Sequence, residues 1–431
     1  MLNRRKFVGV CAAAGAGSYF VNPGFAAEST SPNERLNLAC VGSTNRAGAN
    51  IAALKSQNIV AIADIDSGLL DKGSAPYPGA RKYRDFRIML EKEAEKVDAV
   101  VVGTPDHTHA PAAAMAMRMG KHCYCEKPLT HTVQEARVLA ELAVTKKLKT
   151  QLGTQIHSLD NYRRVVEAIQ GGVIGSVKEA HVWSNAKYTG GKLVPAEKPR
   201  NVDWDLWLGP ASERDYCQGI HPFNWRKYWD YGTGALGDFG CHYMDLTHWA
   251  LKLRHPDTVS ARGNPLDPIT PPAWCIVDYE FPARGSLPAV KLTWYDGGKR
   301  PAKLAELKDK NGAALNWSAG QLFVGDQGMI LSNYTNHIIL PEEKFADVRR
   351  PVQSIPKSIG HHNEWVRAIK EDRETTCNFD YSGALTECVL LGVASFRSQQ
   401  PIEWDAVNLK VKNDEGAQEF IHKEYRKGWT L

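Results

Sequence analysis

Residues 36–48 read LNLACVGSTNRAG, an apolar run that is followed by a glycine turn and then by a helical pattern. From here the chain alternates short apolar runs with segments of helical spacing, as a doubly wound parallel sheet does. Strands are predicted at about 36–41, 58–64, 98–104, 121–126 and 149–154, and helices at about 48–56, 86–94, 109–119 and 132–146. The sequence therefore predicts an α/β fold whose N-terminal domain, residues 34–156, is a Rossmann doubly wound parallel sheet.

The pattern changes after Gln155. A helix is predicted at about 160–170, and later segments alternate polar and apolar residues with turn signals between them. The predicted strands lie at about 177–183, 275–281 and 289–294, with a hairpin over 322–334. Because 431 residues suffice for two domains, residues 157–431 are predicted to form a C-terminal α+β domain with an open, mostly antiparallel sheet.

The first 27 residues differ in character from the rest. Arg4, Arg5 and Lys6 precede an apolar run from Val8 to about Tyr19, and small residues follow before Glu28. This is the pattern of a twin-arginine signal peptide, residues 1–27, so we expect the twin-arginine export machinery as a partner and a periplasmic or secreted protein. A short membrane anchor is the alternative, but the run falls short of the roughly 18–20 apolar residues that a span needs.

Charge and cysteine content exclude some classes of function. The formal net charge of +5 falls by three, to +2, when the three basic residues of the leader are removed. This balance predicts no nucleic-acid partner. Of the nine cysteines, one lies in the leader and most others lie inside apolar runs, which favours buried free thiols over a disulfide framework or a zinc site.

The turn after the first strand is suited to a phosphate. Gly42 allows backbone N–H groups and the next helix N-terminus to approach a pyrophosphate, with Thr44, Asn45 and Arg46 beside it. The loop departs from G-x-G-x-x-G, because Thr44 and Ala47 stand where the second and third glycines would be. As a lone motif it is weak, since such turns also occur for reasons of backbone geometry alone.

Asp64 strengthens this interpretation, because it ends the second apolar run 22 residues after Gly42. A carboxylate there accepts hydrogen bonds from the adenine-side ribose and repels a 2′-phosphate, which favours NAD over NADP. The alternative role, capping of the next helix, describes Asp66 better than Asp64.

Two further motifs lie at the ends of the predicted strands 98–104 and 121–126: TPDHTH at residues 104–109 and Glu126-Lys127-Pro128. Together with the loop above, they resemble the Gfo/Idh/MocA oxidoreductases (glucose-fructose oxidoreductase, inositol dehydrogenase and relatives), from Leu36 to about Asn413. The resemblance implies that Thr104, Pro105 and His109 belong to the cofactor site. It also implies that Glu126 contacts the nicotinamide ribose, that Lys127 touches the substrate hydroxyl, and that Pro128 follows a cis bond.

The second signature is Asp238 and His242, four residues apart after a glycine-rich loop. On a helix this spacing places both side chains on one face. The pair matches the D-x-x-x-H of the family, so the resemblance assigns His242 as the proton acceptor and Asp238 as its partner or as a ligand of a substrate hydroxyl. Independently, hydride transfer from a secondary alcohol needs a base, and histidine titrates in the right range. An interior His–Asp pair is the alternative.

Aromatic residues surround this motif. Trp204 and Trp207 are predicted to be core, whereas the segment 221–231 is either a substrate loop or core. The candidate substrate residues are His157, Trp225, Arg226 and Tyr231. No H-x-x-x-H or C-x-x-C pattern is present, so no metal is predicted.

The sequence thus predicts an oxidoreductase that transfers a hydride between a secondary alcohol of a sugar, polyol or glycoside and a tightly bound NAD. A redox-neutral glycosidase or epimerase that acts through a keto-sugar is one alternative. A sugar-binding protein without activity, on a dehydrogenase scaffold, is another. The family resemblance also implies a homo-oligomer, with the second domain serving substrate binding and assembly.

Overall fold

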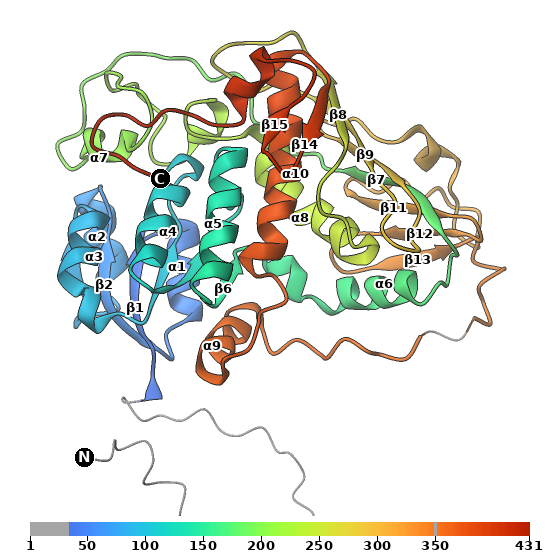
Figure 1. Cartoon of the computed structure of the whole chain (residues 1–431), viewed down its shortest axis with the longest axis horizontal. Helices are drawn as coiled ribbons and strands as arrows, with labels where there is room; N and C mark the ends of the chain where they lie inside the picture. The colour runs from blue at the N-terminus through green and yellow to red at the C-terminus, as the bar shows by residue number, and fades with distance from the viewer. Residues whose placement is uncertain (1–33, 349–350) are drawn as a thin grey trace, which may run out of the picture. The chain divides into compact units, whose positions relative to one another are not determined.

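The computed structural model describes residues 34–348 and 351–431, so the predicted signal peptide lies outside the described residues (Figure 1). The first sheet has six parallel strands in the order β3-β2-β1-β4-β5-β6. The strands are β1 Asn37–Val41, β2 Asn58–Ala63, β3 Arg81–Tyr83, β4 Ala99–Val102, β5 His122–Cys125 and β6 Thr150–Leu152. The predicted Rossmann sheet is therefore confirmed.

Five helices connect these strands: α1 Asn45–Ala53, α2 Ser67–Ser74, α3 Phe86–Glu93, α4 His109–Arg118 and α5 Val133–Thr145. The parallel strands are almost continuously apolar because helices cover both faces of such a sheet. The predicted helix at 48–56 is displaced, since α1 already begins at Asn45, directly after the glycine turn.

The second sheet has nine strands in the order β13-β12-β11-β7-β10-β9-β8-β14-β15. All its pairs are antiparallel except β7 with β10. The strands are β7 Val177–Trp183, β8 Thr258–Gly263, β9 Cys275–Phe281, β10 Val290–Tyr295, β11 Gly320–Gly325, β12 Met329–Ser332, β13 His337–Leu340, β14 Ile402–Asp405 and β15 Lys410–Val411. The predicted mostly antiparallel sheet and the hairpin of β11 and β12 are confirmed.

Three helices cover one face of this sheet: α6 Asp160–Gln170, α8 Gly234–Leu251 and α10 Phe379–Ser398. The helix α10 also packs against α5 of the first half (Figure 1). Two further helices are α7 Trp204–Leu208 and α9 His361–Glu371. Residues 36–431 form one compact unit, and the predicted boundary between residues 156 and 157 remains a prediction.

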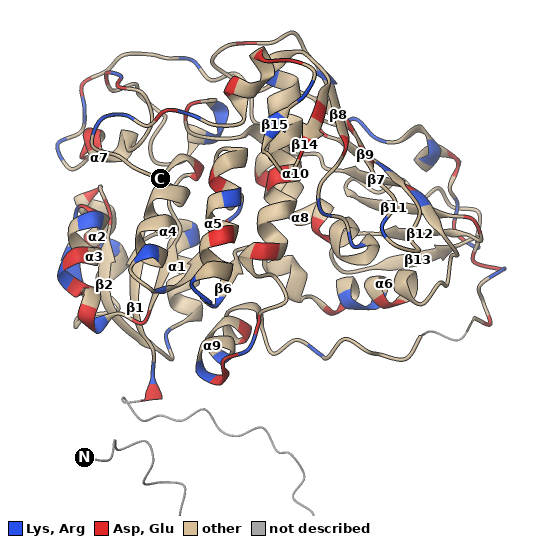
Figure 2. Cartoon of the chain, in the orientation of Figure 1, with Lys and Arg blue, Asp and Glu red and all other residues tan. Residues whose placement is uncertain are grey.

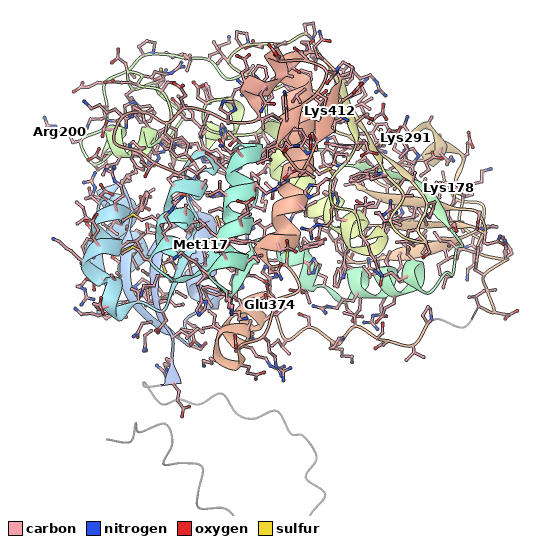
Figure 3. The ribbon with its side chains drawn as sticks, in the orientation of Figure 1. Met117, Lys178, Arg200, Lys291, Glu374 and Lys412 are labelled. Carbon is pink, nitrogen blue, oxygen red and sulfur yellow. The ribbon has the colours of Figure 1, made fainter. Side chains whose placement is uncertain are left out.

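Side-chain burial follows this layering (Figure 3). Met117 of α4 is fully buried against the first sheet, whereas Lys178 of β7 and Lys291 of β10 are exposed. The eight cysteines within the described ranges are buried and free, as predicted. No helix in these ranges has both the length and the apolar character needed to cross a bilayer.

Candidate active site

A cavity of about 710 Å³ lies at the carboxyl ends of the parallel strands, where ligands bind in doubly wound folds. The predicted site residues that line it are Gly42, Thr44, Asn45, Arg46, Asp64, Thr104, Pro105, His109, Glu126, Lys127, Trp225, Arg226, Asp238 and His242. Two predicted residues, His157 and Tyr231, do not line it. The long-range convergence of Lys127 with Asp238 and His242 is thus observed.

The glycine turn opens one end of this cavity. Gly42 has a φ of +91°, and a Cβ there would lie 3.0 Å from the carbonyl oxygen of Gly103, so only glycine fits. The helix α1 starts three residues later without a side-chain cap and without an acidic residue in its first turn. Asp66, in contrast, caps α2 by accepting hydrogen bonds from the N–H groups of Gly68 and Leu69. Uncapped N–H groups beside Arg46 are chemically suited to bind an anion.

Asp64 follows β2 and accepts hydrogen bonds from the glycine turn. Its Oδ2 accepts hydrogen bonds from the backbone N of Ser43 at 3.1 Å and from the Ser43 Oγ at 2.6 Å, and its Oδ1 accepts one from the N of Asp66 at 3.1 Å. Burial raises the pKa of Asp64, and these hydrogen bonds oppose the rise. The carboxylate therefore both shapes the turn and lines the cavity.

The two motifs after β4 and β5 are tied together. His109 lies between the carbonyl oxygens of Thr104 and Pro128, with ring nitrogens 2.8 Å from each. The Lys127–Pro128 bond is cis, as the resemblance implied. The Glu126 Oε1 accepts hydrogen bonds from Asn50 at 2.9 Å and from Gln155 at 3.0 Å. Burial raises the pKa of Glu126, so this carboxyl is held by amides in a dry part of the cavity.

Lys127 and Asp238 form the central charge pair. The Lys127 Nζ donates to Asp238 Oδ1 at 2.6 Å and to the Asp238 carbonyl oxygen at 2.7 Å. Arg226 donates to Oδ1 at 3.2 Å, and the Tyr188 hydroxyl donates to Oδ2 at 3.0 Å. Burial alone would raise the pKa of Asp238, but the charges of Lys127 and Arg226 outweigh burial and hold this pKa well below its usual range.

His242 has a different partner. Its Nδ1 lies 2.7 Å from the Oγ1 of Thr154, whose hydroxyl donates to the carbonyl oxygen of Cys241 at 3.2 Å. With the Thr154 proton assigned to this carbonyl, the Thr154 oxygen accepts the proton of Nδ1, and Nε2 is unprotonated. Burial and the nearby charge of Lys127 lower the pKa of His242 well below its usual value, so the imidazole is neutral near neutral pH.

The predicted pairing of Asp238 with His242 is therefore corrected. Among the described residues the two side chains make no hydrogen bond to each other, because Lys127 and Arg226 engage Asp238 while Thr154 engages His242. Their shared helix face is confirmed by the cavity that both line.

Comparison with known sequences decides the family. Residues 12–154 match the oxidoreductase family domain described as an NAD-binding Rossmann fold, and residues 172–431 match the C-terminal alpha/beta domain of the same family. The chain belongs to the Gfo/Idh/MocA oxidoreductase family. Its first sheet is accordingly an NAD-binding Rossmann sheet, and its uncapped α1 terminus and glycine turn fit that group.

Curated relatives match this oxidoreductase over part of their length. Inositol 2-dehydrogenase from Rubrobacter xylanophilus is 31% identical over 150 residues, which are 33% of this chain and 42% of the relative. Levoglucosan dehydrogenase from Pseudarthrobacter phenanthrenivorans is 28% identical over 169 residues, 39% of this chain and 36% of the relative. The chain thus aligns with less than half the length of either relative.

A solved structure shares the fold more completely. The WlbA dehydrogenase from Bordetella pertussis, solved with NADH and UDP-GlcNAcA, superposes with a TM-score of 0.59 at 16% identity. The match covers 86% of this chain and 99% of that one. At this identity the likeness establishes the fold of the oxidoreductase.

Three residues of the site escaped the sequence analysis. Asp106 is buried in the wall of the cavity and accepts a hydrogen bond from Thr233 Oγ1 at 3.0 Å. Burial, with the nearby charge of Asp238, raises the pKa of Asp106 to about 7. Tyr188 and Thr154 are the other two. Thr154 follows β6 directly, so its place at a strand end was the available signal, whereas Tyr188 lies in an irregular segment that offered none.

The two predicted substrate residues outside the cavity belong to the core. The His157 ring is fully buried, its Nδ1 lies 2.9 Å from the carboxylate of Asp245, and it stacks on Trp249 with ring centroids 4.0 Å apart. Tyr231 is fully buried and packs on Trp207 at 4.6 Å. Trp204 and Trp207 are buried, as predicted. Their rings also stack on each other.

One group of side chains within the described ranges has the atoms and spacing that could ligate a metal. His157, Asp245 and Cys377 lie within 4.8 Å of one another in the core, apart from the cavity. Figure 2 shows Lys and Arg residues interspersed with Asp and Glu residues over the molecule, consistent with the near-balanced net charge.

Proposed function

We propose that this oxidoreductase transfers a hydride between a secondary alcohol of a sugar, polyol or glycoside and a tightly bound NAD. The observation that carries the proposal is the meeting of a neutral histidine and a lysine in the cavity of an NAD-binding sheet. The names of the inositol and levoglucosan dehydrogenases support the class of substrate. The binding of UDP-GlcNAcA by a structural neighbour is consistent with it.

The residues that would hold NAD follow from the geometry. The N–H groups at the start of α1, with Arg46, would bind the pyrophosphate, and Asp64 would accept the ribose hydroxyls of the adenosine. Glu126 would accept hydrogen bonds from the nicotinamide-side ribose. The position of Asp64 favours NAD over NADP. When bound, NAD supplies a nicotinamide carbon that accepts the hydride.

The residues of the chain would manage the proton and the oxygen charge. His242 Nε2 is the base that takes the hydroxyl proton of the substrate as the C–H bond breaks. The Lys127 ammonium stabilises the developing alkoxide, because it lies in the same cavity and is oriented by Asp238. Asp238 holds Lys127 in place through their hydrogen bond, and Trp225 and Arg226 contribute to the substrate wall.

Two expectations extend the proposal to the cell. A twin-arginine leader would export the folded protein together with its NAD, which would then be regenerated within each reaction cycle. Regeneration would come from a second substrate or from a redox-neutral reaction through a keto-sugar. Assembly into a homo-oligomer is proposed from the family resemblance.

The test is turnover of a panel of sugars, polyols and glycosides by the wild-type protein and by His242→Ala. Native mass spectrometry of the purified protein accompanies it and detects any bound dinucleotide. We expect NAD to be detected and at least one panel member to be oxidised by the wild type alone. No turnover of any panel member by either protein would instead support a sugar-binding protein without activity, and a product with unchanged redox state would support the keto-sugar route.

A further inference from the structure

The chain makes a long excursion between β7 and α8. Residues 184–233 leave the second sheet and contain only the short helix α7 and a 3-10 turn at Asn224–Lys227. The excursion has an apolar cluster of its own, made by Val202, Trp204, Trp207, Leu208, Ala211, Cys217, Ile220, Trp225, Tyr228 and Tyr231. Because these side chains are buried together, the segment is a folded unit rather than a loose loop.

This excursion is fastened to the Rossmann sheet at the end of β2. The backbone N of Ser67 donates to the carbonyl oxygen of Asn201 at 2.9 Å, and the N of Asp203 donates to the carbonyl oxygen of Ile65 at 3.1 Å. Arg84 donates to the carbonyl oxygens of both Ile65 and Asn201. The seam therefore joins two segments that are more than a hundred residues apart in the chain.

One carboxylate lies at the centre of the seam. The Asn201 Nδ2 donates to Asp66 Oδ1 at 2.8 Å, and the Nε2 of His221 lies 3.1 Å from Asp66 Oδ2. Asp66 is buried, whereas Asn201 is exposed and His221 is half-buried, so the two hydrogen bonds are partly shielded from water. Asp66 also caps α2, which fixes it on the cofactor side of the seam.

The seam lies at the adenosine end of the cavity. His221, Pro222 and Phe223 of the excursion line the same cavity as Asp64 and Arg84. The Phe223 side chain is 60% exposed, although it is a large aromatic residue, and the Arg226 guanidinium lies 5.3 Å from its ring centroid. An adenosine bound against Asp64 would thus meet a wall supplied by His221 and Pro222, whereas Phe223 lies beside Arg226, which donates to Asp238 at the catalytic end.

We propose that residues 184–233 are a clasp that retains NAD by closing over its adenosine end, with Asn201 and His221 latched to Asp66. This proposal rests on the proposed function, since it requires NAD to occupy the cavity. Departure of the dinucleotide then requires the latch to open, so NAD leaves slowly compared with the sugar product. The clasp gives a structural reason for a cofactor that stays with the protein through repeated cycles.

The experiment measures exchange of bound NAD for isotopically labelled NAD in the full-length protein, followed by native mass spectrometry. The test variant is Asn201→Ala/His221→Ala, which opens the latch without removing the cap of α2. The matched control is Arg200→Gln, because Arg200 neighbours Asn201 but is exposed and points away from the molecule (Figure 3). Two lost hydrogen bonds to a buried carboxylate predict exchange that is roughly 10- to 100-fold faster, with the control at the wild-type rate.

A second variant covers the case in which the double variant does not fold. Asn201→Asp keeps the size of the side chain but places a second carboxylate against Asp66, so it also predicts faster exchange. Exchange at the wild-type rate in the folded variants would overturn the clasp while leaving the proposed function intact. A wild-type protein that binds no NAD at all, purified or added, would overturn both.

Discussion

The helix α8 presents two carboxylates that lie two turns apart, Asp238 and Asp245, and they have very different surroundings. Asp238 faces the cavity and holds Lys127, with Arg226 and Tyr188 as further donors. Asp245 is sealed in the core, where it contacts His157 and the hydroxyl of Tyr381. Asp245 lies beside a histidine but away from the cavity, whereas Asp238 contacts two cations and lines the cavity. Contact with the cavity and its cations, and not nearness to a histidine, therefore identifies the candidate catalytic carboxylate.

The largest effect is expected for Lys127→Met, which removes the cation that Asp238 holds. Loss of the charge that stabilises the alkoxide predicts a fall in kcat/KM of about 10²- to 10³-fold. Steady-state kinetics on the best panel substrate measure it, with the exposed Lys178→Met as the control. A fall of less than about threefold would remove Lys127 from the reaction.

The second prediction concerns His157 and Asp245, which contact each other in the core. His157→Phe keeps an aromatic ring against Trp249 but leaves the Asp245 carboxylate without one buried partner. The free energy of unfolding should fall by about 1–3 kcal/mol, while kcat/KM of the folded protein stays near the wild-type value. Denaturant unfolding and kinetics on the same sample measure both quantities, and a large loss of kcat/KM at unchanged stability would place His157 in the reaction instead.

The third prediction uses Asp106, whose pKa is raised to about 7 by burial and by Asp238. A carboxyl whose pKa is higher in the folded than in the unfolded state contributes stability at low pH, and this contribution is lost as the pH rises from about 4 to about 7. Asparagine does not titrate, so Asp106→Asn should gain stability relative to the wild type between pH 5 and pH 8, by about 2–3 kcal/mol. Thermal unfolding at the two pH values measures the gain. A difference in Tm that does not change with pH would contradict a buried titrating carboxyl.

The smallest expected effect is at the rim of the cavity. Phe223→Ala removes the exposed aromatic ring beside Arg226, so the KM for a glycoside with a second ring should rise by roughly two- to fivefold with little change in kcat. Initial rates with a monosaccharide and with its glycoside separate the effect. An equal change for both substrates would show that Phe223 does not contact the second ring.

The fold was largely predictable because its strands carry strong local signals. Runs such as Ala99–Val102 are continuously apolar, which is expected of strands that helices cover on both faces. The strand β3 was not predicted, because Arg81, Lys82 and Tyr83 form a short, polar edge strand. The helix α10 was not predicted either, because its residues are buried on nearly all sides and no amphipathic period marks it.

The residues of the candidate site could be predicted only where they belong to a recognisable sequence motif. Glu126-Lys127-Pro128 and the spacing of Asp238 and His242 were sufficient to anticipate the convergence in the cavity. The partner of His242 could not be predicted, because Thr154 contacts His242 from a distant segment of the chain. His157 was placed with the substrate residues because the sequence does not reveal whether a histidine faces a cavity or Trp249 in the core.

The most direct test of the central claim is a single-turnover experiment on NAD-loaded protein. The near-ultraviolet absorbance of reduced nicotinamide is followed after mixing with the best substrate, for the wild type and for His242→Ala. A general base contributes about 10²- to 10⁴-fold, so the variant should retain its NAD but reduce it slower by that factor. Reduction at the wild-type rate by a fully loaded His242→Ala protein would contradict the account.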